Sequence, residues 1–182
     1  MRHEETILAG FGGQGVLFAG QLLSYAGMSE GLHVTWIPSY GPEMRGGTAN
    51  CTVIVSEEEI GAPVVRNPTA AIVFNGPSMA KYEPLVKPGG VLLVNASLIE
   101  TETHRTDLRA VYVPASYLAA ELGNVRMANM ILLGAFVELT GLVAIETVMA
   151  QLDEHLPQRR REWLEPNYTA LAKGVALVQN VA

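Results

Sequence analysis

Short apolar runs alternate with stretches of helical periodicity along the first two thirds of the chain. The apolar runs predict six buried strands, over residues 6–9, 33–37, 49–55, 70–74, 91–94 and 110–113. The helical periodicity predicts helices over 16–28 and 77–86. We expect the second strand to end at Pro38, because proline lacks the amide donor that a strand uses. Apolar strands that alternate with helices are typical of a largely parallel sheet covered on both faces.

The last third of the chain has helical periodicity only. Helices are predicted over 115–122, 126–139, 145–156 and 167–181. The chain contains no internal repeat, low-complexity tract or linker. The sequence therefore predicts an α/β fold over residues 1–182 as a single domain. We expect a three-layer α/β/α sandwich with a mostly parallel central sheet and a helical C-terminal third.

A glycine-rich loop joins the first predicted strand to the first predicted helix. Its candidate site residues are Gly10, Gly12, Gly13, Gln14 and Gly15, with Phe11 between the first two glycines. Glycines let a backbone approach a ligand, and the free amides at a helix start favour an anion. Close packing of a neighbouring subunit, or a tight turn, requires the same glycines. The loop is therefore expected to serve either a subunit contact or turn, or a bound anion.

The same loop matches the G-x-G-x-x-G pattern of dinucleotide-binding proteins. Such a site also needs an acidic residue at the end of the second strand, about 20 residues further on, to bind the ribose hydroxyls. The second predicted strand continues into Pro38 and Ser39 instead, and Glu30 lies before that strand. No Gly-Lys-Ser/Thr follows the glycines, which excludes a Walker phosphate loop. We therefore expect no tight NAD site.

A second unusual loop is predicted over residues 39–48, longer than most connections between adjacent strands. It combines a charged pair with residues that give the backbone freedom, and its candidate site residues are Tyr40, Glu43, Arg45, Gly46 and Gly47. The planar guanidinium of Arg45 is suited to a carboxylate or phosphate, either of a ligand or of a partner chain. The alternative is that Arg45 pairs with Glu43 or with a backbone carbonyl.

Composition favours a protein with partners and argues against nucleic acid. Hydrophobic residues make up 49% of the chain and charged residues 16%, against about 25% charged in a typical domain. A surface with few charges is suited to burial against other subunits, although a large α/β core would also give a low fraction of charged residues. The net charge of −6 opposes binding to a phosphate backbone. The basic run Arg159-Arg160-Arg161 is interpreted as a solvated helix start or loop.

Redox and metal chemistry are not expected within this chain. Cys51 is the only cysteine, which excludes an internal disulfide and an iron–sulfur cluster ligated by this chain alone. The four histidines have no neighbours at metal-ligand spacing, so we assign neither a metal site nor a catalytic residue. The N-terminus lacks the apolar segment of a signal peptide, and the apolar stretch 127–137 is shorter than the roughly 18 residues that cross a membrane. We expect a cytoplasmic protein that binds no membrane.

Three stretches together resemble the gamma subunits of 2-oxoacid:ferredoxin oxidoreductases, the pyruvate/ketoisovalerate oxidoreductase gamma family. They are the glycine loop 10–15, the loop 40–47, and residues 122–135 with the sequence Leu-Gly-Asn-Val-Arg-Met-Ala-Asn-Met-Ile-Leu-Leu-Gly-Ala. The third stretch also has a structural interpretation, in which Gly123 ends one helix, Asn124 caps the next, and Met127 and Met130 face the core.

The resemblance implies a role in an enzyme that oxidatively decarboxylates a 2-oxoacid and transfers the acyl group to coenzyme A. It implies thiamine diphosphate, magnesium and iron–sulfur clusters on partner subunits, since this chain has no Gly-Asp-Gly motif and one cysteine. The implied partners are alpha and beta subunits, a ferredoxin-like delta subunit and ferredoxin as acceptor. The 2-oxoacid, whether pyruvate, 2-oxoglutarate, branched-chain or aryl, is left open. The alternative function is a stand-alone nucleotide- or anion-binding α/β regulatory module.

Overall fold

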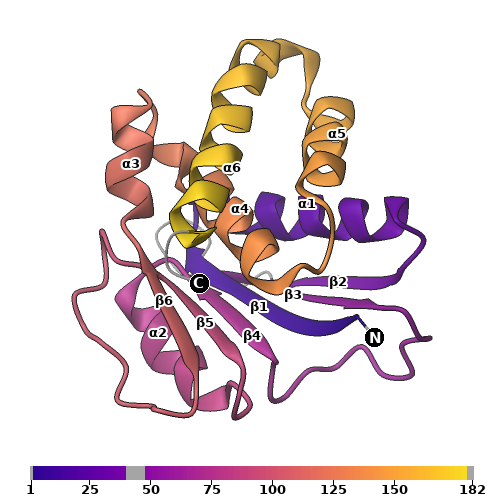
Figure 1. The fold of residues 1–182 in the computed structure, drawn as a ribbon, viewed down its shortest axis with the longest axis vertical. Helices are drawn as coiled ribbons and strands as arrows, with labels where there is room; N and C mark the ends of the chain where they lie inside the picture. Colours follow the sequence, from indigo (N-terminus) through magenta and orange to yellow (C-terminus); the bar gives the residue numbers. More distant parts are fainter. Residues whose placement is uncertain (1, 40–47, 180–182) are drawn as a thin grey trace.

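A computed structural model describes residues 2–39 and 48–179, and its strands form one sheet (Figure 1). The strand order across this sheet is β2-β3-β1-β4-β5-β6. The strands are β1 (His3–Phe11), β2 (His33–Ser39), β3 (Thr48–Ser56), β4 (Ala70–Val73), β5 (Val91–Asn95) and β6 (Arg109–Val113). All six strands predicted from the sequence are present, most of them longer than the apolar runs that predicted them.

One reversed strand interrupts an otherwise parallel arrangement. β1, β4, β5 and β6 are parallel, whereas β3 is antiparallel to both β1 and β2. In the central strand, Leu8 is paired with Cys51 of β3 on one side and with Ile72 of β4 on the other. Successive antiparallel strands need no crossover helix, which is why β2 and β3 follow each other directly in the chain. The mostly parallel sheet is thus confirmed, with β3 as the exception.

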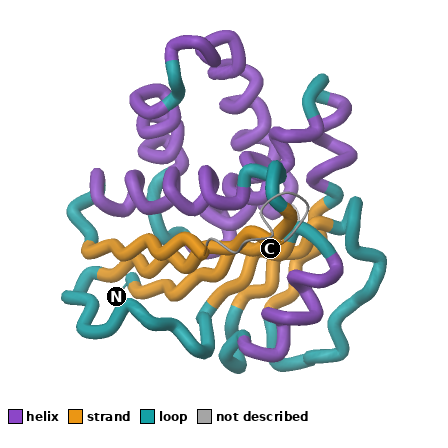
Figure 2. Tube along the Cα trace, turned by 180° about the vertical axis from the view of Figure 1, so that it is seen from behind, coloured by secondary structure: helices purple, strands orange, loops and turns teal. Residues whose placement is uncertain are grey.

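The helices cover the two faces of the sheet unequally (Figure 2). α2 (Gly76–Tyr82) lies on one face and continues as a 3₁₀ turn over Glu83–Leu85. The opposite face carries α1 (Val16–Ser29), α3 (Ala115–Glu121), α4 (Ala128–Thr140), α5 (Ile145–His155) and α6 (Leu164–Gln179). This arrangement confirms the predicted three-layer sandwich and its helical C-terminal third. It also makes one helical layer much thicker than the other.

Alternate residues of each central strand point into two separate cores. Leu8 and Ile72 pack under α1 and α4, whereas their neighbours Ile7 and Val73 pack under α2. Both cores are apolar because the inner strands are buried on both faces, which is what their uninterrupted apolar sequences predicted.

α4 is the most deeply buried helix, and two glycines allow it to be. Every residue from Ala128 to Val137 is buried, so this helix is enclosed on all sides. A Cβ built on Gly134 would overlap the carbonyl oxygen of Leu171 in α6, and a Cβ on Gly174 would overlap the carbonyl oxygen of Ile131 in α4. The two helices therefore meet backbone to backbone.

Two local expectations need correction, and a third is confirmed. Pro38 does not end β2 but is paired with Cys51 inside it. β2 is an edge strand, where a missing amide donor leaves no partner unsatisfied. α6 begins at Leu164 rather than at residue 167, with Pro166 tolerated in its first turn. The run Arg159–Arg161 lies in an exposed 3₁₀ helix over Gln158–Trp163, where Arg161 pairs with Asp153.

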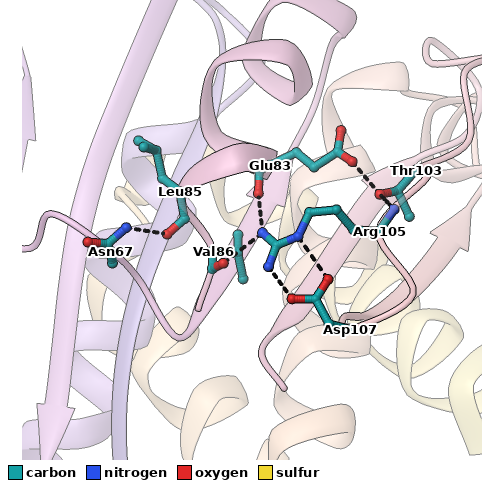
Figure 3. Close-up of polar contacts among 7 residues, drawn as sticks. All are labelled: Asn67, Glu83, Leu85, Val86, Thr103, Arg105 and Asp107. Carbon is teal, nitrogen blue, oxygen red and sulfur yellow. Dashed lines mark hydrogen bonds and ion pairs between the residues drawn. The ribbon is translucent and has the colours of Figure 1, made fainter. Parts of the chain in front are cut away.

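The end of α2 is fixed by the connection between β5 and β6 (Figure 3). The Arg105 guanidinium donates to the backbone carbonyls of Glu83, at 3.0 Å, and Val86, at 2.7 Å, and pairs with the Asp107 carboxylate. Thr103 donates its hydroxyl to the Glu83 side chain. The Glu83 carbonyl also accepts from the Val86 amide at 3.3 Å, so Arg105 adds a second donor to this carbonyl and ties the end of the 3₁₀ turn to the β5–β6 connection.

The contact between α4 and α6 predicts that Gly134→Ala destabilises the fold. Alanine in place of glycine inside a helix is favourable by about 1 kcal/mol on intrinsic propensity, so a loss of stability would isolate the packing effect. We expect the free energy of unfolding to fall by about 2 kcal/mol or more, as for other overpacked cores. Urea denaturation measures this change. Gly61→Ala is the control, because a Cβ there meets nothing within 4 Å. Equal stability of the two variants would contradict the prediction.

Candidate functional site

The parallel strands β1, β4, β5 and β6 all end at one edge of the sheet, which we call the carboxyl edge. The chain leaves β1 for α1 on one face and leaves β4 for α2 on the other. Ligands of α/β sheets bind outside the carboxyl ends of the strands, at the place where successive connections diverge to opposite faces. That place lies between β1 and β4, and the loop 12–15 after β1 lies beside it.

The glycine loop is closed by its own glutamine. The Gln14 side-chain Oε1 accepts a hydrogen bond of 2.6 Å from the Phe11 amide, and the Gln14 amide donates to the Phe11 carbonyl at 3.2 Å. Gly13 and Gly15 have φ of 95° and 73°, in the left-handed region that favours glycine. A Cβ on Gly10 would lie 2.6 Å from the same Gln14 oxygen. Gly10, Gly13 and Gly15 are therefore required by the turn itself, whatever else the loop does.

Asn129 connects this loop to the start of α4. Its Nδ2 donates to the Gly15 carbonyl at 3.1 Å, and a Cβ on Gly15 would collide with the same amide nitrogen. This contact joins the first and third stretches of the family resemblance, which are more than 100 residues apart in the sequence. Sequence reasoning treated the third stretch mainly as core and did not select Asn129. The available signal was an amide residue within an otherwise apolar helix start.

Two further buried asparagines follow the strands β4 and β5, and sequence reasoning missed both. Asn95 has no exposed surface, donates from Nδ2 to the Ser116 hydroxyl at 2.8 Å and accepts from the Ser116 amide at 3.3 Å. Asn75 caps α2 by accepting from the Ser78 amide at 2.9 Å. Among the described residues, the Asn75 Nδ2 and the Ser78 hydroxyl are buried without a protein partner. Each asparagine is the first polar side chain after an apolar strand, which is the signal that was available.

The second predicted loop joins the sheet at the same edge. Its candidate residues Tyr40, Glu43, Arg45, Gly46 and Gly47 lie outside the described residues. The residues on either side are described: Ser39 is paired with Asn50, and Thr48 is paired with Phe11. Both ends of the loop are therefore attached next to the strand end that carries the glycine loop.

The strand order argues against a dinucleotide site. β3 lies between β1 and β2, so the end of β2 is not adjacent to the glycine loop as the ribose-binding position requires. Glu30 lies at the far end of α1, where its carboxylate accepts from the Arg2 side chain and the Ala144 amide, both at 2.7 Å. These partners hold the pKa of Glu30 below its usual value although burial opposes them. Glu30 is thus part of a structural contact.

Cys51 is placed as a core residue. Its side chain is fully buried, and burial raises the pKa of the thiol to about 12. A thiol of this kind is protonated and a poor nucleophile near neutral pH. Within residues 2–39 and 48–179, no three His, Cys, Asp or Glu side chains are arranged to hold a metal ion, and no helix is long and apolar enough to cross a membrane.

Comparison with known sequences gives consistent matches. The family described as pyruvate ferredoxin/flavodoxin oxidoreductase matches residues 5–177. The 2-oxoglutarate synthase subunit KorC of Methanothermobacter marburgensis is 34% identical over 166 residues, covering 87% of this chain and 89% of KorC. The ketoisovalerate oxidoreductase subunit VorA of the same organism is 44% identical over 143 residues, covering 78% of this chain. The chain spans only 30% of the length of VorA.

Solved structures agree with the sequence matches. The gamma subunit of a keto/oxoacid ferredoxin oxidoreductase from Geobacter sulfurreducens has a TM-score of 0.81 and 29% identity, covering 94% of this chain and 96% of that subunit. The 2-oxoglutarate:ferredoxin oxidoreductase of Magnetococcus marinus, solved with 2-oxoglutarate, coenzyme A and succinyl-CoA, has a TM-score of 0.91 and 26% identity. The match covers this whole chain and 32% of the Magnetococcus chain. None of these four proteins is described as a stand-alone regulatory module, so that alternative gains no support.

The position of β3 predicts that the isolated chain does not bind NAD with micromolar affinity. The reason is that β3 separates the end of β2 from the glycine loop, and β2 itself ends in Pro38 and Ser39 rather than in an acidic residue that could bind the ribose hydroxyls. Isothermal titration calorimetry with NAD measures this, and a dinucleotide-binding dehydrogenase serves as the positive control. A saturable micromolar isotherm would show that the glycine loop is a nucleotide site after all.

Proposed function

The chain belongs to the pyruvate ferredoxin/flavodoxin oxidoreductase family, and we propose that it is the gamma subunit of a multi-subunit 2-oxoacid:ferredoxin oxidoreductase. The observation that carries the proposal is the likeness to the Geobacter gamma subunit, which extends over nearly the full length of both chains. Likeness to KorC, also over most of both chains, supports the same assignment. The proposed enzyme is cytoplasmic and catalyses the oxidative decarboxylation of a 2-oxoacid to an acyl-CoA. This chain forms a single domain of that enzyme.

In this proposal the chain contributes assembly and shape, and partner subunits hold the redox centres. Thiamine diphosphate, magnesium and the iron–sulfur clusters are assigned to the alpha, beta and delta subunits, with ferredoxin as the acceptor. This division is supported by the cysteine content, because the chain has a single cysteine, which is buried, and iron–sulfur clusters are ligated by several thiolates. Coenzyme A is the co-substrate of the whole complex. The coenzyme A and succinyl-CoA in the Magnetococcus structure support this class of reaction.

The glycine loop and the loop 40–47 are proposed to face the rest of the enzyme together. Support comes from the pairing of Phe11 with Thr48, which attaches both loops to the carboxyl edge. One side of this region is formed by the glycine-loop residues Gly10, Gly12, Gly13, Gln14 and Gly15. The other side is assigned to the candidate residues of the loop 40–47, which are Tyr40, Glu43, Arg45, Gly46 and Gly47. We assign the Arg45 guanidinium to a carboxylate or phosphate, either of a partner chain or of coenzyme A.

The proposal predicts a sharp difference between the isolated chain and the complex. Alone, the chain should be colourless and inactive, because its sequence has too few thiols for a cluster and lacks the thiamine motif. Coexpressed with the proteins encoded beside it, the tagged chain should copurify with them as a brown complex. That complex should reduce ferredoxin when given a 2-oxoacid and coenzyme A, with partners identified by mass spectrometry. A brown and active preparation of the single chain would contradict the proposal.

A second prediction concerns Arg45→Ala in that complex. The variant should fold normally as an isolated chain, since Arg45 is a charged residue and the described cores are built from apolar side chains. It should then either lower copurification with the partners or raise the KM for coenzyme A about tenfold. The first result identifies a subunit contact and the second a ligand contact. Arg66→Ala, at an exposed arginine in the segment before β4, is the control. If both variants assemble and turn over like wild type, Arg45 has neither role and its pairing with Glu43 is the better interpretation.

A further inference from the structure

The end of the sheet opposite the carboxyl edge, where the parallel strands begin, is rich in charge, and we call it the amino edge. Four of the six arginine or lysine ion pairs within residues 2–39 and 48–179 lie there: Arg2–Glu30, Arg2–Glu57, Lys87–Glu5 and Arg105–Asp107. Figure 3 shows the last of these beside the end of α2. Paired, partly exposed charges of this kind are typical of a surface in contact with water.

The carboxyl edge has the opposite character. Its described segments are 12–15, 74–77, 96–99 and 114–117, together with the turn 122–127 that leads into α4. Arg126 is the only charged residue in these described segments. Depletion of charge distinguishes the core of a protein interface from ordinary surface. These described segments are therefore poorer in charge than the chain as a whole, of which 16% is charged.

The same edge exposes large apolar side chains. Phe11, Leu98, Tyr117 and Val125 are 39%, 50%, 63% and 55% exposed. They come from four separate segments that the fold brings to this end of the sheet: the end of β1, the turn after β5, the start of α3 and the turn before α4. The Tyr117 amide donates to the Ser97 hydroxyl at 3.0 Å, which joins two of these segments. Several apolar groups at one edge mark an interaction site more strongly than scattered ones do.

Three polar side chains at this edge are used within the chain, whereas the Asn75 Nδ2 and the Ser78 hydroxyl are buried without a protein partner among the described residues. Gln14 accepts from the Phe11 amide, Asn129 donates to the Gly15 carbonyl, and Asn95 binds Ser116. The glycine loop also carries the Phe11 side chain, which is 39% exposed. Of the two uses that the sequence left open for this loop, contact with a protein is the one that this exposed apolar group favours.

We infer that the carboxyl edge is a docking surface for a partner subunit of the same enzyme, an inference that rests on the proposed function. The occupant is a protein face that is apolar and poor in charge, with an acidic side chain to meet Arg126. In VorA and in the Magnetococcus chain, this fold accounts for about a third of a longer chain, so additional polypeptide is attached to the domain in both. This additional polypeptide in the relatives supports a protein as the occupant of the carboxyl edge.

The experiment compares charge-introducing variants at the two ends of the molecule. Tyr117→Glu and Val125→Glu place a carboxylate on the proposed surface, and Met28→Glu does so near the amino edge, at a side chain that is 61% exposed. In the coexpressed complex, the two carboxyl-edge variants should weaken association by about tenfold or more, as expected for buried interface positions. Met28→Glu should associate like wild type. Sedimentation of the purified complex over a dilution series measures the change.

Folding and ligand effects are separated from docking in the same material. Circular dichroism of each isolated chain checks folding, and Tyr117→Ser repeats the test without adding charge. If the carboxyl-edge variants associate like wild type, the inference is wrong while the proposed function stands. If they associate normally but raise the KM for coenzyme A, the surface binds the co-substrate instead, which also overturns the inference. If the wild-type chain associates with no partner subunit, the proposed function is wrong, and this inference is wrong as well.

Discussion

The backbone hydrogen bonding of β1 is the interaction on which the rest of the structure depends. This strand is antiparallel to β3 along one side and parallel to β4 along the other. Because both edges are occupied, β1 is buried, and its alternate side chains begin the two cores. Its end also fixes where the glycine loop and the start of β3 meet, through the pairing of Phe11 with Thr48. Fold and candidate site are thus set by one strand.

Glycine serves two different physical purposes in this chain. At Gly13 and Gly15 it permits left-handed backbone in a loop that Gln14 closes. At Gly134 and Gly174 it permits α4 and α6 to touch through their backbones, which encloses α4 and thickens the helical layer on one face. Neither purpose requires a ligand. A G-x-G-x-x-G pattern is consequently weak support for a nucleotide, and here the strand order removes the remaining support.

The distribution of charge gives the molecule two unlike ends. Ion pairs such as Lys87–Glu5 and Arg105–Asp107 suit the amino edge to water, whereas the carboxyl edge presents Phe11, Leu98 and Tyr117. A domain that supplies no redox chemistry can still be essential if it covers or shapes a reaction centre held elsewhere. In the proposed enzyme the apolar end is the part of this domain suited to contact other subunits, because burying apolar surface is the main favourable term in protein association.

The sequence by itself determined the elements and the chemistry that the chain lacks. Apolar runs located all six strands, since strands buried on both faces have little choice of residue, and one cysteine decided the question of clusters. Tertiary structure alone decided the reversal of β3 and the roles of Asn95 and Asn129. These depend on neighbours distant in sequence: Asn129 meets Gly15 only because α4 packs across the start of α1. A local pattern records what a residue prefers, and only the folded chain determines what it touches.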